Sequence, residues 1–224
     1  MNPLHIVVLD RDTLVNRPFD FDFPHTLSSY GTTEAHETLE RIRGADIVIT
    51  NKVVISAQAF AENPQLKLVA VTATGVNNVD VEAAKQNGTA VCNIRAYGNE
   101  SVAEHAFMMM ITLMRNLPAY QRDVAAGLWE NSPFFCHLGA PMRDLNGKTL
   151  AIFGRGNIGK TLATYAQAFK MNVVFAEHKH AETVRDGHVS FDEAIRSADA
   201  LSLHCPLTPQ TENMIGEAEL QQMK

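Results

Sequence analysis

The sequence feature that most limits the fold of this chain is a glycine-rich turn at residues 154–159. The turn reads Gly154-Arg155-Gly156-Asn157-Ile158-Gly159. A GxGxxG pattern alone is weak, but here it follows the apolar run 150–153 and precedes apolar residues at helical spacing. That setting is typical of the strand-turn-helix unit that holds the pyrophosphate of a dinucleotide. We therefore expect an α/β protein with a Rossmann-type parallel sheet.

The three glycines of this turn have separate expected roles. Gly154 permits the tight turn, Gly156 lets a pyrophosphate approach the backbone, and Gly159 lets the helix pack on the strand. The amides of the first helical turn have no partner within the helix and would face the phosphates.

Glu177 is the candidate for the carboxylate that such a turn requires. It follows the apolar run 173–176, and its distance from Gly159 is close to the spacing of about 20 residues that the motif predicts. A carboxylate there accepts both ribose hydroxyls of NAD and repels the extra phosphate of NADP. The basic stretch 178–180 follows directly and could attract that phosphate, so NADP stays open as an alternative. We expect NAD(H) as the cofactor.

Short apolar runs alternate with helical patterns along the chain, which is typical of parallel strands joined by crossover helices. We expect strands at 6–9, 47–50, 68–71, 90–92, 149–153, 172–176 and 200–204, with a weaker one at 188–190. We expect helices at 34–43, 56–62, 79–87, 101–117, 158–169, 191–197 and 217–224. The pattern predicts two domains, 1–99 and 100–224.

The middle of the chain carries its own boundary signals. Ser101 with Glu104 has the spacing of a capping box, which predicts a helix starting after Ser101. Pro118 is expected to end that helix. The stretch 119–146 contains several glycines and prolines and is expected to be an irregular connection.

Composition and charge exclude several classes of protein. The net charge of -6 argues against a nucleic-acid or anionic membrane surface, because either needs clustered Lys and Arg. No apolar run reaches the roughly 18 residues that span a bilayer. The three cysteines, Cys92, Cys136 and Cys205, lack a CxxC pair, which argues against a disulfide framework and a zinc site. We expect a cytoplasmic protein without a metal.

Four stretches, taken in order, resemble the D-isomer-specific 2-hydroxyacid dehydrogenase family. They are 73–80 (ATGVNNVD), 101–105 (SVAEH), the glycine turn, and 203–208 (LHCPLT). The triplet 50–52 and the segment 129–136 look most like the glycerate dehydrogenase, or hydroxypyruvate reductase, branch. The resemblance implies a flavodoxin-like substrate domain and an inserted, doubly wound Rossmann domain, with the active site in the cleft between them.

The resemblance also implies substrate-binding residues in the first domain. The amides of Gly75 and Val76 would hold the substrate carboxylate, a role that fits glycine because it permits close approach of an anion. Lys52 would lie at the mouth of the same cleft. The alternatives are a plain strand-to-helix turn and a solvent-facing lysine.

For the cofactor, the resemblance adds residues outside the glycine turn. Glu177 would bind the ribose and Cys205 and Pro206 would lie beside the adenosine, with Thr211 nearby. Asn157 and Ile158 would start the helix at the pyrophosphate. His204 is interpreted as structural or near the cofactor, because the acid-base histidine of the family comes later in the chain.

The resemblance implies that the catalytic arginine, glutamate and histidine all fall after Lys224. We therefore expect no catalytic residue in this chain, a Rossmann sheet that is incomplete at its C-terminal end, and cofactor binding without turnover by 1–224 alone. A sheet ending at 200–204 would also leave an apolar strand as an open edge. The sequence is expected to be part of a longer polypeptide.

The function that follows is reduction of hydroxypyruvate, with glyoxylate as a further small 2-keto acid, by NADH. One alternative is a non-catalytic NAD(H)-sensing protein similar to a corepressor on the same scaffold. Another is a formate dehydrogenase, which shares the SVAEH stretch. The family forms homodimers through the region corresponding to 101–146, and the apolar helix 107–117 fits this expectation, although burial within one subunit would give the same pattern.

Overall fold

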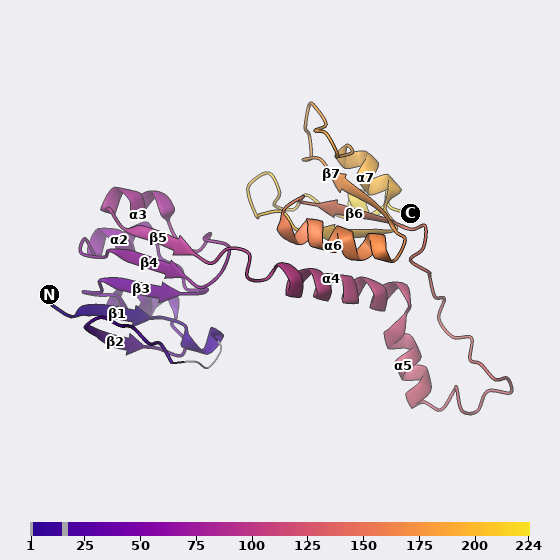
Figure 1. Ribbon diagram of the computed structural model, residues 1–224, viewed down its shortest axis with the longest axis horizontal. Coiled ribbons are helices and arrows are strands. Elements are labelled where there is room, and N and C mark those ends of the chain that lie inside the picture. The colour runs from indigo at the N-terminus through magenta and orange to yellow at the C-terminus, as the bar shows by residue number, and fades with distance from the viewer. Residues whose placement is uncertain (1, 15–17) are drawn as a thin grey trace. The chain divides into compact units, whose positions relative to one another are not determined.

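The computed structural model describes residues 2–14 and 18–224 and divides into two compact units, Met1–Tyr97 and Gly98–Lys224. Each unit is built on its own parallel sheet (Figure 1). The α/β class expected from the alternating apolar runs is therefore confirmed. The division falls two residues before the expected boundary between 99 and 100.

The sheet of the first unit has the strand order β2-β1-β3-β4-β5, and every pair is parallel. This 2-1-3-4-5 order is that of flavodoxin-like folds, as the family resemblance implied. The strands are β1 (Leu4–Val8), β2 (His25–Ser29), β3 (Ile47–Thr50), β4 (Leu68–Val71) and β5 (Ala90–Asn93). The sequence reading missed β2, because its sequence HTLSS lacks an apolar run and its strand lies at the sheet edge.

Short helices connect these strands. They are α1 (Thr38–Arg41), α2 (Ala57–Glu62) and α3 (Val81–Asn87), with 3-10 turns at Arg11–Thr13 and Ala35–Glu37. Asp80 caps α3 by accepting a hydrogen bond from the amide of Ala83, and Gly88 ends it at a φ of 75°. The helix expected at 34–43 is shorter and mixed in type, since a 3-10 turn at Ala35–Glu37 runs directly into a single α-helical turn at Thr38–Arg41.

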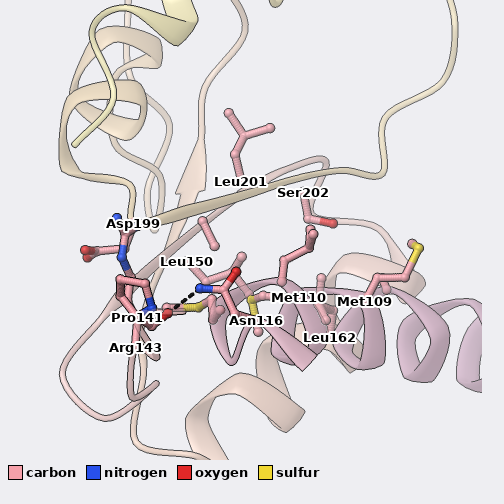
Figure 2. A pocket seen from close by; sticks show the side chains of 14 residues that line it. Met109, Met110, Asn116, Pro141, Arg143, Leu150, Leu162, Asp199, Leu201 and Ser202 are labelled. Carbon is pink, nitrogen blue, oxygen red and sulfur yellow. Dashed lines mark hydrogen bonds between the residues drawn. The ribbon is translucent and has the colours of Figure 1, made fainter. Parts of the chain in front are cut away.

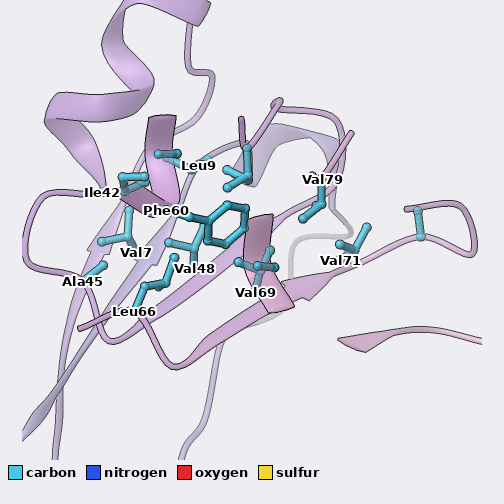
Figure 3. Packing of buried hydrophobic residues seen from close by; sticks show 14 residues of the cluster. Val7, Leu9, Ile42, Ala45, Val48, Phe60, Leu66, Val69, Val71 and Val79 are labelled. Carbon is cyan, nitrogen blue, oxygen red and sulfur yellow. The ribbon is translucent and has the colours of Figure 1, made fainter. Parts of the chain in front are cut away.

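The core of the first unit lies on one face of the sheet (Figure 3). Phe60 from α2 packs among valines of the central strands, including Val48 and Val69. The opposite face buries Ile6 and Val8 against the aromatic side chains of 19–23. Both faces are covered, which explains why the central strands read as continuous apolar runs.

The sheet of the second unit has the order β7-β6-β8, again all parallel. Its strands are β6 (Thr149–Phe153), β7 (Asn172–Ala176) and β8 (Ala200–Leu203). The weak strand expected at 188–190 is only a single bridge between Val189 and Ala176. If the strands of this unit are numbered in chain order, with β6 as the first, β7 as the second, the bridge at Val189 as the third and β8 as the fourth, the order in the sheet is 3-2-1-4. This is the Rossmann order, and its switch point lies between β6 and β8.

Helices cover both faces of this second sheet (Figure 1). Helices α4 (Asn99–Met114) and α6 (Asn157–Ala168) lie side by side on one face, and α7 (Phe191–Ser197) packs on the other. The remaining helices are α5 (Leu117–Ala125) and α8 (Glu217–Leu220). Within the described residues, no helix is long and apolar enough to cross a membrane.

Two boundary predictions in the middle of the chain are wrong. Helix α4 begins two residues before Ser101 with Gly98 as its cap, so Ser101 lies in the first turn and its hydroxyl donates to the Gly98 carbonyl at 3.5 Å. Pro118 does not end a helix but lies in the first turn of α5, where its missing amide costs nothing. The irregular connection is therefore shorter than expected and runs through 126–148.

Replacing Phe60 with alanine tests the core of the first unit. Phe60 is 1% exposed, so loss of its ring should lower the free energy of unfolding by about 3–5 kcal/mol. Val54→Ala, at a side chain 62% exposed in the same unit, is the control and should change it by no more than about 0.5 kcal/mol. Urea titration followed by circular dichroism measures both, and equal effects would contradict the core described above.

Candidate functional site

The turn between β6 and α6 brings three backbone segments into close contact. Gly154 has a φ of +110°, and a Cβ on it would lie 2.6 Å from the carbonyl carbon of His204. A Cβ on Gly159 would lie 2.1 Å from the carbonyl oxygen of Gly154. Only glycine satisfies these two positions without moving the backbone.

Gly156 is different, because a Cβ on it would meet no atom of the described chain within 4 Å. Helix α6 begins at the next residue, and no side chain of the described residues caps it. The Lys160 amide donates to the Gly156 carbonyl at 3.0 Å, so the amides before it lack helical partners. A pyrophosphate fits this arrangement, since unpaired amides and the positive end of the helix dipole favour an anion.

The other residues of the turn have distinct surroundings. Arg155 and Asn157 are exposed, whereas Ile158 is half-buried and packs against the core beneath α4 and α6. The backbone of the turn therefore faces solvent, and the Ile158 side chain holds the turn against the core.

The end of β8 lies directly against the glycine turn. The His204 amide donates to the Phe153 carbonyl at 2.7 Å, and the His204 ring is hydrogen-bonded to the Ser202 hydroxyl at 2.9 Å. Burial lowers the pKa of His204, which favours its neutral form. These contacts support the interpretation of His204 as structural.

The loop after β8 is closed by Thr211. Its hydroxyl donates to the Pro206 carbonyl at 2.6 Å and accepts a hydrogen bond from the Thr208 amide at 2.8 Å. Cys205 is half-buried and packs against the core beneath α7. Thr211 and Cys205 both border the same small hollow as Gly154.

Glu177 lies at the end of β7 and is almost completely buried, with 3% of its surface exposed. Its Oε1 accepts hydrogen bonds from the His178 amide at 2.8 Å and from Nη2 of Arg185 at 2.7 Å. Its Oε2 accepts from the amide and from Nε of Arg185, at 3.0 and 2.8 Å. The Arg185 guanidinium, followed by the His178 amide, holds the pKa of Glu177 well below its usual range.

Arg185 is the residue near this site that the sequence reading missed. It lies eight positions after Glu177 in a segment without helix or strand, and no motif marks it. The sequence shows only a single arginine shortly after Glu177, the expected ribose-binding carboxylate. That position alone does not tell whether Arg185 pairs with Glu177 or is an ordinary surface residue.

A hollow of about 60 Å³ gathers several of the predicted cofactor residues. Its lining includes five of them, namely Gly154, Arg155, Glu177, Cys205 and Thr211. The other five, Gly156, Asn157, Ile158, Gly159 and Pro206, do not line it. The strand order, the open turn and the uncapped helix end define a dinucleotide-binding protein of the Rossmann class.

A larger cavity of about 580 Å³ lies between α4 and the strands β6 and β8 (Figure 2). Its lining is mostly apolar and includes Met109 and Met110 from α4 and Leu150 from β6, whereas the Leu201 side chain points away from α4 and packs against the core beneath α7. None of the predicted cofactor residues lines it. This cavity is therefore separate from the glycine turn.

In the first unit, a buried carboxylate positions the loop that carries Lys52. Asp10 follows β1, is 4% exposed, and accepts hydrogen bonds from the amides of Asn51, Lys52 and Val53 at 2.6 to 3.3 Å. These residues lie at the carboxyl ends of β1 and β3, which is the switch point of a 2-1-3-4-5 sheet. The Lys52 side chain is exposed, and no described carboxylate pairs with its ammonium.

The loop with Gly75 and Val76 lies next to the Lys52 loop. The Asn78 side chain donates to the Val53 carbonyl at 3.0 Å, and the Ile55 amide donates to the Asn78 carbonyl at 2.8 Å. Within the described chain, no hydrogen bond uses the amides of Gly75 or Val76. The structure thus places the loop that carries Lys52 beside the loop whose Gly75 and Val76 amides make no hydrogen bond within the described chain.

Comparison with known proteins gives the family. A family model for the D-isomer specific 2-hydroxyacid dehydrogenase, NAD binding domain, matches residues 107–224. Glycerate dehydrogenase of Methylorubrum extorquens is 40% identical over 98% of this chain and 69% of that protein. Hydroxypyruvate reductase of Blautia hydrogenotrophica is 35% identical over 86% of this chain and 61% of that protein.

Solved structures agree with this result. A glyoxylate reductase from Paecilomyes thermophila has 25% identity and a TM-score of 0.77, over 100% of this chain and 71% of that chain. A D-lactate dehydrogenase from Aquifex aeolicus, complexed with NAD and lactic acid, has 26% identity and a TM-score of 0.76, over 98% and 66%. The chain belongs to the D-isomer specific 2-hydroxyacid dehydrogenase family.

Several expectations from the sequence are now settled. The family resemblance is confirmed, including its glycerate dehydrogenase branch, and residues 107–224 match an NAD-binding domain. The alternative of a non-catalytic NAD(H)-sensing protein is not favoured, because these relatives are named as dehydrogenases and reductases.

Gly156→Ala separates cofactor binding from folding. The added methyl would meet no atom of the described residues within 4 Å, so thermal unfolding should stay unchanged. The methyl would, however, occupy the space through which the pyrophosphate approaches the backbone. We expect NADH affinity, measured by fluorescence titration, to fall by about tenfold or more. Gln167→Ala, on the exposed side of the same helix, is the control. Unchanged affinity in Gly156→Ala would show that the pyrophosphate binds elsewhere.

Proposed function

We propose that this chain binds NADH and hydroxypyruvate for the reduction of hydroxypyruvate to D-glycerate, with glyoxylate as a second substrate. The observation that carries the proposal is the open phosphate site at Gly156 in a chain 40% identical to a glycerate dehydrogenase. The second unit is the cofactor domain and the first unit the substrate domain.

The first unit supports the substrate half of this proposal. A small 2-keto acid carries a carboxylate, which needs hydrogen-bond donors and a positive charge. The unpaired amides of Gly75 and Val76 supply the donors, and the nearby exposed Lys52 supplies the charge. Asp10 acts as a positioning residue, because it holds the backbone on both sides of Lys52.

The second unit supports the cofactor half. NADH, when bound, supplies the hydride that reduces the keto carbon. The amides at the start of α6 bind the pyrophosphate, and the neutral His204 with the Thr211 loop forms the wall beside Gly154. The residues of this chain thus bind and orient the two reactants.

A substrate panel tests the activity, using protein expressed from the complete gene. Hydroxypyruvate should consume NADH fastest, followed by glyoxylate, in an assay that follows absorbance at the nicotinamide band. Formate with NAD tests the formate dehydrogenase alternative and should give no NADH. Absence of NADH consumption with every 2-keto acid would overturn the proposed function.

Lys52→Met tests the substrate site in the same assay. Loss of the ammonium should raise KM for hydroxypyruvate by about tenfold, because one charge contact to the carboxylate is lost. Lys85→Met is the control, since Lys85 is an exposed lysine of α3 outside the site. An equal change in both variants, or none in Lys52→Met, would contradict the role of Lys52.

We also propose a homodimer formed through residues 101–146. Support comes from apolar side chains that this region leaves exposed, above all Phe135 at 98% and Leu138 at 88%. The double variant Phe135→Asp/Leu138→Asp should halve the mass measured by light scattering, whereas Leu220→Asp outside the region should not. A monomeric wild-type protein would contradict the proposal.

A cytoplasmic location is part of the same proposal. The three cysteines are all unpaired, which favours a reducing compartment. Cell fractionation checks this location.

A further inference from the structure

The side chain of Asn93 holds one peptide bond of the loop that carries Gly75 and Val76. Asn93 is the last residue of β5, and its Nδ2 donates a hydrogen bond to the Thr74 carbonyl at 2.6 Å. No other donor among the described residues reaches that carbonyl. Among the described hydrogen bonds, this is therefore the one that orients the peptide between Thr74 and Gly75.

The same peptide bond carries the Gly75 amide. A trans peptide directs its carbonyl and its N–H to opposite sides, and no peptide bond of the described residues is cis. Because the Thr74 carbonyl points toward Asn93, the Gly75 N–H points away from it. Gly75 is exposed, and its amide has no acceptor within the described chain. The Asn93 contact thus keeps a free donor directed away from β5 and available to an anion.

Glycine makes this peptide easy to turn over. Gly75 has no Cβ, so it can adopt backbone conformations that other residues avoid, and rotation of the preceding peptide by half a turn costs little. The rotated peptide would present the Thr74 carbonyl oxygen, with its partial negative charge, in place of the N–H. That oxygen would repel a carboxylate. The group that holds the carbonyl therefore determines whether the loop attracts or repels an anion.

Neighbouring parts of the loop are held without the Asn93 side chain. The Ile94 amide donates to the Ala73 carbonyl at 3.1 Å. On the other side, the Val76 side chain packs against the core, and its carbonyl accepts a hydrogen bond from the Val79 amide at 3.0 Å. Loss of the Asn93 side chain should therefore free the one peptide that it holds and leave the rest of the loop in place.

We propose that Asn93 is a positioning residue for the substrate carboxylate, because it holds the peptide between Thr74 and Gly75 with the Gly75 N–H directed to the substrate. The inference rests on the proposed substrate site at Gly75 and Val76. Asn93 acts through the peptide that it holds and does not itself contact the substrate. Its hydrogen bond also polarises that peptide, which makes the Gly75 N–H a stronger donor.

Three variants of Asn93 test this proposal in protein expressed from the complete gene. Asn93→Ala should raise KM for hydroxypyruvate by about tenfold, because the peptide is free to turn over. Asn93→Asp has the same shape but places a carboxylate oxygen against the Thr74 carbonyl, so it should raise this KM further. Asn93→Gln keeps an amide donor and should lie between the wild type and Asn93→Ala. KM for NADH and kcat should change by no more than about twofold, since neither depends on the carboxylate contact.

Asn172→Ala is the matched control. The Asn172 side chain also donates to a backbone carbonyl, that of Gly147, at 3.1 Å, but it lies at the start of β7 in the second unit. Its loss should leave KM for hydroxypyruvate unchanged. Thermal unfolding followed by circular dichroism checks that each variant is folded at the assay temperature. If Asn93→Ala unfolds, the comparison of Asn93→Asp with Asn93→Gln decides the question.

Three results would contradict the role of Asn93. They are an unchanged KM for hydroxypyruvate in the folded variants, a smaller increase in Asn93→Asp than in Asn93→Ala or Asn93→Gln, and an equal increase of KM for hydroxypyruvate and NADH. Wild-type protein that consumes no NADH with hydroxypyruvate would instead contradict the proposed function.

Discussion

The close approach of three backbone segments at Gly154 is the contact on which the second unit depends. The turn after β6, the first turn of α6 and the end of β8 meet with no room for a side chain. Because the segments touch through backbone, the helix start is fixed relative to two strand ends. Its unpaired amides then point to the switch point of the sheet, where Rossmann proteins bind their ligand. The fold and the phosphate site are thus consequences of one steric requirement.

Much of the fold could be predicted from apolar runs. Strands β3, β4, β6 and β7 were predicted at the residues where they occur, because buried parallel strands need continuous apolar sequence. The edge strand β2 could not be found in this way, since it pairs on one side only and carries polar residues. Pro118 was misinterpreted because proline stops a preceding helix and starts a following one equally well.

The candidate site shows a different limit of sequence reasoning. The glycine turn could be interpreted because its requirements are local. Arg185 and Asp10 could not, because their importance comes from partners that only the folded chain brings near. Asp10 lies about 40 residues before the amides it binds. Because these donors are backbone amides, no residue type in the sequence marks them as partners of Asp10. Patterns reveal positions that must be glycine or apolar, but not which charged residues meet.

The Asp10 contact has a consequence for how substrate preference could change in this family. The carboxylate holds Asn51, Lys52 and Val53 through their backbone amides and touches none of their side chains in those bonds. Every amino acid except proline has that amide. Side chains on this loop can therefore be exchanged during evolution while the loop stays in place. A fixed backbone with replaceable side chains is a scaffold on which new keto-acid specificities can arise by single substitutions.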